Sequence, residues 1–154
     1  MKLRGILATS LITALALGPG YSATPAAPQA QLQNPPAMPI VGDPREKHLK
    51  NIRQLTYTGE NAEAYFSYDG KKIIFQSTRE PYKCDQLFTM NKDGTNVQLV
   101  STGRGRVTCG YFTPDGQRII YASTHLGSPD CPPPADKSEG YVWAIYPSFD
   151  IFSA

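Results

Sequence analysis

The stretch AYFSYDGKKIIFQST at residues 64–78 decides the fold, because it returns as GYFTPDGQRIIYAST at residues 110–124. The offset of 46 residues holds through both copies without a gap. A repeat of this period is typical of arrays in which one supersecondary unit is copied and stacked on itself. We therefore expect an all-β chain built from repeated units rather than around a single unique core.

Each unit is expected to be a four-stranded antiparallel blade. In the first unit, the apolar and alternating runs predict strands at residues 63–67, 72–77, 85–90 and 96–100. Successive apolar positions in the second of these strands indicate burial on both faces. Four strands joined by short turns within about 46 residues make one propeller blade. Residues 59–104 are thus predicted to be the first full blade.

The units on either side of that blade are incomplete. Residues 48–58 contain a run, 53–56, that resembles the fourth strand and predicts a lone fourth strand ahead of the blade. Residues 105–154 begin a second blade, depart from the pattern in a long loop at 125–148, and resume it as a third strand. The folded part, 48–154, is therefore expected to be a partial propeller and an N-terminal fragment of a longer protein.

The turns of the units carry an Asp-Gly pair. Pro114 fixes φ near −65° at the second position of its turn, which predicts a type I turn with Gly116 in the left-handed region. One Asp in each turn is too few for a calcium loop, so a structural role is expected. The predicted structural turn residues are Asp69, Gly70, Asp93, Gly94, Asp115 and Gly116.

The N-terminus reads as an export signal. Residues 1–23 hold Lys2 and Arg4, then an apolar run too short to span a bilayer comfortably, and end in small residues. Residues 24–47 are rich in Pro and predict an extended linker. An uncut membrane anchor is the alternative for the first segment. We expect a periplasmic or secreted bacterial protein that is not embedded in the membrane.

The charge balance excludes one class of partner. Without Lys2 and Arg4, 13 of the 15 basic residues remain against 13 acidic ones, so the net charge falls to about zero. A nucleic-acid binder needs a basic face to neutralise phosphates. We therefore expect no nucleic-acid partner.

The repeated unit resembles a known family. The pattern (Ser/Thr)-x-Asp-Gly-(Lys/Gln)-x-Ile-Ile-(Phe/Tyr), followed by DQLFTMNKDGTNVQL at residues 85–99, is similar to the TolB-type β-propeller repeat, a relative of the WD repeat. The resemblance covers about residues 48–124 and 149–154. It implies a propeller with about six blades when complete, a bacterial periplasmic location and a protein-binding scaffold. TolB itself carries an α/β domain where this chain has a Pro-rich linker, so the resemblance is to the repeat and not to TolB.

Blade topology brings the cysteines and several side chains to one face. Links between second and third strands and links between blades share an end of a propeller, so Cys84, Cys109 and Cys131 should lie near one another. We favour a disulfide between Cys84 and Cys131, with Cys84–Cys109 as the alternative, in an exported compartment that permits it. A metal site of the three cysteines with His125 is disfavoured, because no closely spaced ligand pair is present. The same face is predicted to bind a partner through Arg79, Arg104, Arg106, His125, Tyr141 and Trp143.

These features lead to one functional hypothesis and two alternatives. We expect a non-enzymatic scaffold, with no catalytic residues, metal or cofactor, that binds a protein or peptide. One alternative is the propeller of a prolyl oligopeptidase-type peptidase or other hydrolase, although the chain has no Gly-x-Ser-x-Gly elbow. The other is a carbohydrate-binding propeller that uses Tyr141 and Trp143.

Overall fold

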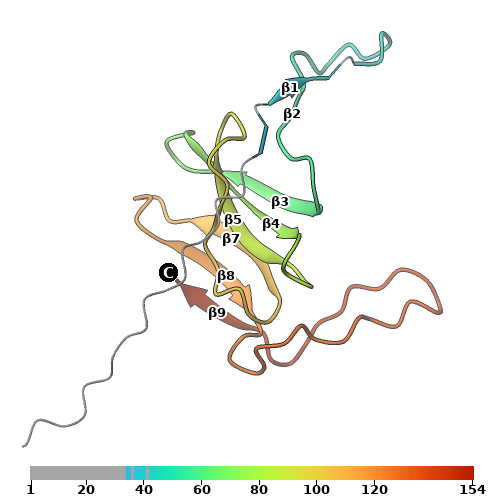
Figure 1. Cartoon of the computed structure of the whole chain (residues 1–154), viewed down its shortest axis with the longest axis vertical. Helices are drawn as coiled ribbons and strands as arrows, with labels where there is room; N and C mark the ends of the chain where they lie inside the picture. Colours follow the sequence, from blue (N-terminus) through green and yellow to red (C-terminus); the bar gives the residue numbers. More distant parts are fainter. Residues whose placement is uncertain (1–33, 36, 41) are drawn as a thin grey trace, which may run out of the picture.

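The structure is a computed structural model, and it describes residues 34–35, 37–40 and 42–154. These residues form nine strands in three antiparallel sheets, and no helix occurs among them (Figure 1). The expected all-β class is therefore confirmed. Accordingly, the described residues contain no helix long and apolar enough to cross a membrane. The predicted signal segment 1–23 and residues 24–33 of the predicted linker lie outside the described residues.

The first blade is a four-stranded sheet in the order β3-β4-β5-β6. Its strands are β3 (Glu60–Phe66), β4 (Lys72–Thr78), β5 (Gln86–Asn91) and β6 (Gln98–Leu99). The fourth strand is shorter than the predicted 96–100, and Asn96, two residues before it, takes a left-handed φ of 56° that does not fit a regular strand. The first strand is longer than the predicted 63–67 and pairs as far as Glu60 with Thr78.

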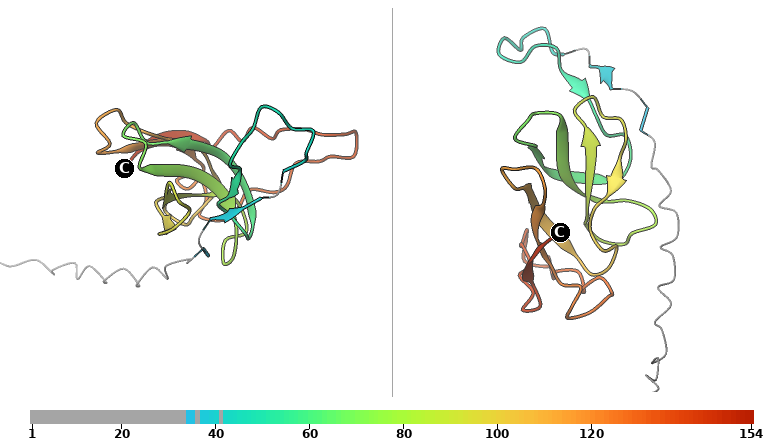
Figure 2. Two further views of the ribbon diagram at one scale, coloured as in Figure 1. Left: turned by 90° about the horizontal axis from the view of Figure 1, so that it is seen from above. Right: turned by 90° about the vertical axis from the view of Figure 1, so that its left-hand side faces the viewer.

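The second blade contains three strands in the order β7-β8-β9. They are β7 (Val107–Phe112), β8 (Ile119–Ser123) and β9 (Asp150–Ser153), and the long loop joins the last two. The two blades lie side by side in Figures 1 and 2. Each contains a register shift in its first strand, at Glu63 (φ 51°) and at Cys109 (φ 53°). These β-bulges are 46 residues apart, so the repeat copies a backbone irregularity that the side-chain pattern does not reveal.

A small sheet precedes the blades. Strand β1 (Met38–Pro39) pairs with β2 (Arg53–Gln54), and both are exposed. The strand β1 falls inside the range predicted to be an extended linker. The predicted lone fourth strand is therefore paired with β1 rather than with a blade. Leu55, which follows β2, packs against the first blade and covers part of its outer face.

The core consists of two apolar layers, one on each face of the first blade. Side chains alternate along a strand, so neighbouring residues of β4 point to opposite faces. One layer is Ile73, Phe75, Phe88, Met90 and Val97, covered by Leu55, Tyr82 and Leu99. The other layer is Ile74, Leu87, Val107, Ile119 and Tyr121, and it joins the two blades. The central strands of the first blade are therefore buried on both faces, as the run of apolar residues predicts.

One glycine allows the blades to approach closely. A Cβ added to Gly110 in β7 would lie 2.6 Å from Leu87 Cδ1 and 3.1 Å from Ile74 Cδ1. Contacts below 3.0 Å force neighbouring atoms to move. The absence of a side chain at Gly110 thus lets Leu87 and Ile74 pack directly on the backbone of β7.

The Asp-Gly turns close the hairpins by a shared network. Gly116 has a φ of 68°, and its N–H donates to the Thr113 carbonyl at 2.8 Å. Asp115 Oδ1 accepts from Thr113 Oγ1 at 2.5 Å and from the Gln117 N–H at 3.0 Å. Asp69 and Asp93 make corresponding bonds to a hydroxyl and a backbone N–H. Each Asp carboxylate therefore holds its turn closed by accepting hydrogen bonds.

We predict that Ile74→Ala and Ile120→Ala, at the same position of the two repeats, differ in cost. Ile74 is fully buried, so its truncation should lower the free energy of unfolding by about 2–5 kcal/mol. Ile120 is 46% exposed, so its truncation should cost clearly less. Urea denaturation of both variants measures the difference. Equal losses would contradict the difference in burial between these two equivalent positions.

The turn aspartates predict acid sensitivity. The Thr113 hydroxyl, followed by the Gln117 N–H, lowers the pKa of Asp115 in the folded state. A lowered folded-state pKa contributes stability that is present above the unfolded-state pKa, near 3.9, and is lost as pH falls through the folded value. Asp115→Asn should therefore reduce stability at neutral pH and flatten its decline below about pH 4. Thermal melts between neutral and acidic pH test this, and an unchanged profile would refute it.

Candidate binding site

The long loop between β8 and β9 is anchored to both blades. A disulfide joins Cys131 in the loop to Cys84, which precedes β5, with their Cα atoms 5.9 Å apart. The Gly105 N–H donates to the Pro129 carbonyl at 2.8 Å. Three consecutive prolines at 132–134 have no N–H to donate, but their carbonyls still accept, and Tyr146 Oη donates to the Pro133 carbonyl at 2.6 Å. The first part of the loop is thereby tied to the first blade and to the link between the blades, its two halves are tied to each other, and the rest projects from the sheets (Figure 1).

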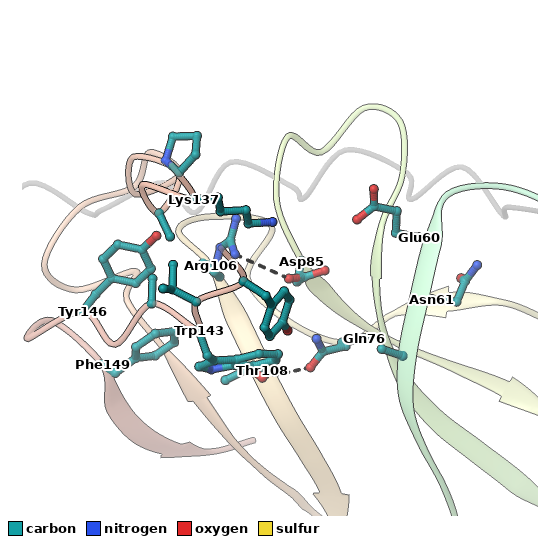
Figure 3. Close-up of a pocket in the computed structure, with 16 residues that line it drawn as sticks. Glu60, Asn61, Gln76, Asp85, Arg106, Thr108, Lys137, Trp143, Tyr146 and Phe149 are labelled. Carbon is teal, nitrogen blue, oxygen red and sulfur yellow. Dashed lines mark hydrogen bonds and ion pairs between the residues drawn. The ribbon is translucent and has the colours of Figure 1, made fainter. Parts of the chain in front are cut away.

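A groove lies between this loop and the strands of both blades (Figure 3). Its volume is about 380 Å³, within the range of small-ligand sites. The strands supply mainly polar side chains, and the loop supplies mainly aromatic and apolar ones. The lining residues are Glu60, Asn61, Ala62, Gln76, Asp85, Arg106, Thr108, Pro134, Ala135, Lys137, Tyr141, Val142, Trp143, Ala144, Tyr146 and Phe149.

The polar side of the groove is centred on Gln76. This residue interrupts the apolar run of β4, and its Oε1 accepts from Thr108 Oγ1 at 2.9 Å and from the Cys109 N–H at 3.3 Å (Figure 3). These bonds tie β4 of the first blade to β7 of the second. Gln76 is therefore fixed in orientation by its oxygen, and an amide nitrogen remains to donate.

A charged pair lies beside the amide. Arg106 Nη1 is 3.9 Å from Asp85 Oδ2, a long separation for an ion pair. Asp85 Oδ1 accepts from Thr78 Oγ1 at 2.8 Å, which holds the carboxylate in place. Among the described residues, Arg106 Nε is buried without a hydrogen-bond partner. The Arg106 guanidinium is thus held by one long ion pair, and it keeps N–H groups that can donate to a ligand.

The loop side of the groove is aromatic and exposed. Trp143 is 65% exposed and Tyr141 is 79% exposed. Lys137 Nζ lies 5.8 Å from the centroid of the Tyr141 ring, within the range of a cation–π contact. The Tyr146 and Phe149 rings pack against each other with centroids 6.0 Å apart. Exposed rings next to polar groups fit a ligand that has both apolar surface and hydrogen-bonding atoms.

The six residues predicted for the partner-binding face divide into two groups. Arg106, Tyr141 and Trp143 line the groove, whereas Arg79, Arg104 and His125 do not. Arg104 is exposed at the link between the blades, outside the groove. The two loop aromatics and one of the three arginines therefore reach the groove, and the other two arginines and the histidine do not.

Arg79 does not belong to an exposed face. It is only 5% exposed, and its guanidinium stacks on Phe88 and Phe75, with Cζ 4.9 and 5.3 Å from the ring centroids. Its Nη2 donates to Asn61 Oδ1 at 2.7 Å. Burial lowers the pKa of Arg79. Arg79 is not part of an exposed face as predicted, because its planar guanidinium covers the end of the apolar layer as an aromatic ring would.

His125 takes the same place in the second blade, 46 residues after Arg79. Its ring lies 4.3 Å from that of Phe152, and its Nδ1 is 2.8 Å from Ser123 Oγ. Arg79 Nε donates to Ser77 Oγ at 2.9 Å in the equivalent contact. Both residues therefore support the packing of their own blade, and neither is placed to meet a ligand in the groove.

The cysteines divide into a bonded pair and a free thiol. Cys84 and Cys131 form the disulfide, and Cys109 is exposed on the bulge of β7. The disulfide uses two of the thiolates that the alternative metal site with His125 would need. In the described part of the chain, no three His, Cys, Asp or Glu side chains are grouped so that they could hold a metal ion.

Several lining residues were not singled out from the sequence. Gln76 and Thr108 lie on strands whose pattern is explained by the core, and Lys137, Tyr146 and Phe149 lie in a loop without periodicity. One signal was available for Gln76, since a polar residue within a doubly buried strand needs a hydrogen-bond partner. The loop residues offered no such signal, because the loop's path depends on tertiary contacts.

Comparisons with known proteins give little beyond this geometry. No protein-family model matches the sequence, and no curated protein matches it either. A solved structure described as "putative TolB from Agrobacterium tumefaciens" is 26% identical, with a TM-score of 0.41. The match covers 46% of this chain and spans a quarter (25%) of that protein's length. The fold described above therefore rests on the strands and their register.

The disulfide should stabilise both the fold and the groove. Cys84 and Cys131 are 47 residues apart, so loop-closure entropy predicts a loss of about 2–4 kcal/mol when the bond is removed. A Cys131→Ser variant should show this loss in denaturation and faster proteolysis within residues 125–148. The Cys109→Ser variant keeps the bond and is the matched control. Equal behaviour of the two variants would contradict the anchoring role.

Proposed function

We propose that this chain is an exported, non-enzymatic β-propeller module that binds a protein or peptide segment in the groove beneath the 125–148 loop. The observation that carries the proposal is that the exposed rings of Trp143 and Tyr141 line the same groove as the fixed amide of Gln76. An apolar side chain of the ligand stacks on the rings while its backbone bonds with the amide and with Arg106. Both kinds of contact are features of peptide recognition.

The blade architecture supports a binding role in a second way. A groove formed by two blades and a disulfide-anchored loop needs no movement of the strands to receive a ligand. Preorganisation of this kind reduces the entropy lost on binding. The resemblance to TolB-type repeats and the predicted signal segment support an exported, periplasmic setting for this module.

A carbohydrate is the second candidate ligand. Exposed rings next to amide and charged side chains also suit a sugar, whose apolar face stacks while its hydroxyl groups form hydrogen bonds. Gln76 supplies an amide on the strand side, and Trp143 supplies a ring on the loop side. The same variants distinguish the two ligands when they are tested against both classes.

Binding should be lost in Trp143→Ala and kept in Ile145→Ala. Both residues belong to the same loop and both are largely exposed, but Ile145 does not line the groove. Truncating an aromatic anchor typically costs 2 kcal/mol or more, so affinity should fall by about thirtyfold. Selection from a phage-displayed peptide library, followed by calorimetry with the selected peptides, measures this, and a glycan array is screened in parallel.

The outcomes separate the hypotheses. Peptide binding that depends on Trp143 supports the proposal, and glycan binding with the same dependence supports the second candidate instead. Binding that survives Trp143→Ala, or falls equally in Ile145→Ala, would place the site elsewhere. Hydrolysis of a selected peptide, seen by mass spectrometry, would contradict the non-enzymatic assignment.

A further inference from the structure

The guanidinium of Arg106 donates no hydrogen bond to any of the described residues. Asp85 Oδ2 lies 3.9 Å from its Nη1, which makes an ion pair but is too long for a hydrogen bond. Its Nε is buried, and only 33% of the side chain is exposed. Burying a cation is costly unless it is both paired and hydrogen-bonded. The guanidinium therefore lacks an acceptor that a ligand in the groove can supply.

Arg79 shows how the same fold satisfies a structural guanidinium. Its Nε donates to Ser77 Oγ at 2.9 Å, and its Nη2 donates to Asn61 Oδ1 at 2.7 Å. Arg106 has no such bonds, and it lines the groove, which Arg79 does not. The first unit has Glu60 at the position of Arg106, so the repeat does not require a basic residue there. The contrast favours a role for Arg106 in the groove over a role in packing.

The amide of Gln76 offers a second unused donor in the same groove. Gln76 is only 4% exposed, yet it lines the groove. The backbone N–H of Cys109 can only donate, so its contact with Oε1 fixes which side of the amide is the oxygen. The Gln76 nitrogen lies on the other side and donates to none of the described residues. The counterpart in the second unit is Ala122, so a buried amide is not a requirement of the repeat.

The two donors lie along one wall of the groove. Residues two apart on a strand point to the same face and are separated by about 7 Å. Arg106 directly precedes β7, two residues before Thr108, whose Oγ1 donates to Gln76 Oε1 at 2.9 Å. The guanidinium and the amide are therefore neighbours on the strand side of the groove (Figure 3). A single small acceptor group can lie between them and the loop.

The charges of the groove lining cancel. Asp85 and Glu60 are its acidic residues, and Arg106 and Lys137 are its basic ones. Asp85 Oδ1 already accepts a hydrogen bond from Thr78 Oγ1 at 2.8 Å. The groove as a whole therefore exerts no general attraction on acidic molecules. A preference for an anion must come from the two unused donors, at the place where they lie.

We propose that the groove binds a carboxylate of its peptide ligand, held by the Arg106 guanidinium and the Gln76 amide nitrogen. The inference rests on the proposed function and narrows its ligand to peptides with a carboxylate at this place. A carboxylate supplies two acceptor oxygens and the negative charge that Arg106 lacks, whereas a backbone carbonyl supplies one oxygen and no charge. Its source is either the C-terminus of the peptide or an acidic side chain. A neighbouring apolar side chain then stacks on Trp143.

The sequence supplies a reporter for this test. Trp143 is its single tryptophan, so tryptophan fluorescence of the full chain reports on the groove. The probes are three libraries of acetylated hexapeptides without Trp. The first has an amidated C-terminus and no acidic residue, the second has a free C-terminal carboxylate, and the third is amidated but contains one Asp or Glu. The second or the third should bind about tenfold or more tightly than the first. The library that gains affinity identifies the source of the carboxylate.

Three variants test the two donors. Arg106→Gln should abolish the preference for a carboxylate, while the first library still binds on the rings. Arg104→Gln is the matched control, because it removes the same charge at an exposed position outside the groove and should keep the preference. Gln76→Glu retains an oxygen for Thr108 and replaces the donor with an acceptor, so it should also abolish the preference. Circular dichroism establishes that each variant is folded.

The outcomes distinguish this inference from the proposed function. Equal binding of the three libraries would overturn the carboxylate site and leave the groove as a peptide site. A preference that survives both Arg106→Gln and Gln76→Glu, or that falls equally in Arg104→Gln, would overturn it as well. Absence of binding by every library, with the selected peptides also failing to bind, would overturn the proposed function and this inference with it.

Discussion

The structure depends on the burial of one sheet face by the next. A four-stranded sheet of this size has two apolar faces, and it cannot cover both by itself. In the first blade, Ile74 and Leu87 on one face are sealed only because β7, β8 and β9 stack over them. At roughly 25 cal/mol for each Å² of apolar surface, burial of several such side chains is the main source of stability. Gly110 is the point at which this contact becomes close enough to exclude any side chain.

The groove follows from the same stacking. Once the blades are side by side, the links at one end of the strands are forced together, and the disulfide between Cys84 and Cys131 fixes the long loop there. Gln76 connects the scaffold and the groove, since its oxygen ties the two blades and its side chain lines the cavity. The Asp-Gly turn between β3 and β4 and the turn between β5 and β6 meet at the other end of the strands, where the Lys92 N–H donates to the Lys71 carbonyl. The structural turns and the binding loop therefore lie at different ends of the strands.

The repeat also explains which polar residues are structural. Arg79 and His125 look like surface functional groups in the sequence, yet each bonds the serine two residues earlier and stacks on a phenylalanine of its own blade. Equivalent positions in two repeats with equivalent contacts point to packing. The groove residues show no such shared contacts. Arg106 stands where the first unit has Glu60, and Lys137 and Trp143 lie in the loop where the second unit departs from the first. The site therefore arises from the differences between the two units.

The sequence by itself determined the all-β class, the strands of the blades, the doubly buried β4 and the geometry of the Asp-Gly turns. These follow from local periodicity and from backbone preferences, both of which act over a few residues. Only the tertiary structure decided the bulges at Glu63 and Cys109, the pairing of β2 with β1, the burial of Arg79 and the choice of residues that line the groove. These depend on contacts between segments distant in the chain, and on how closely two faces approach, which no local pattern specifies.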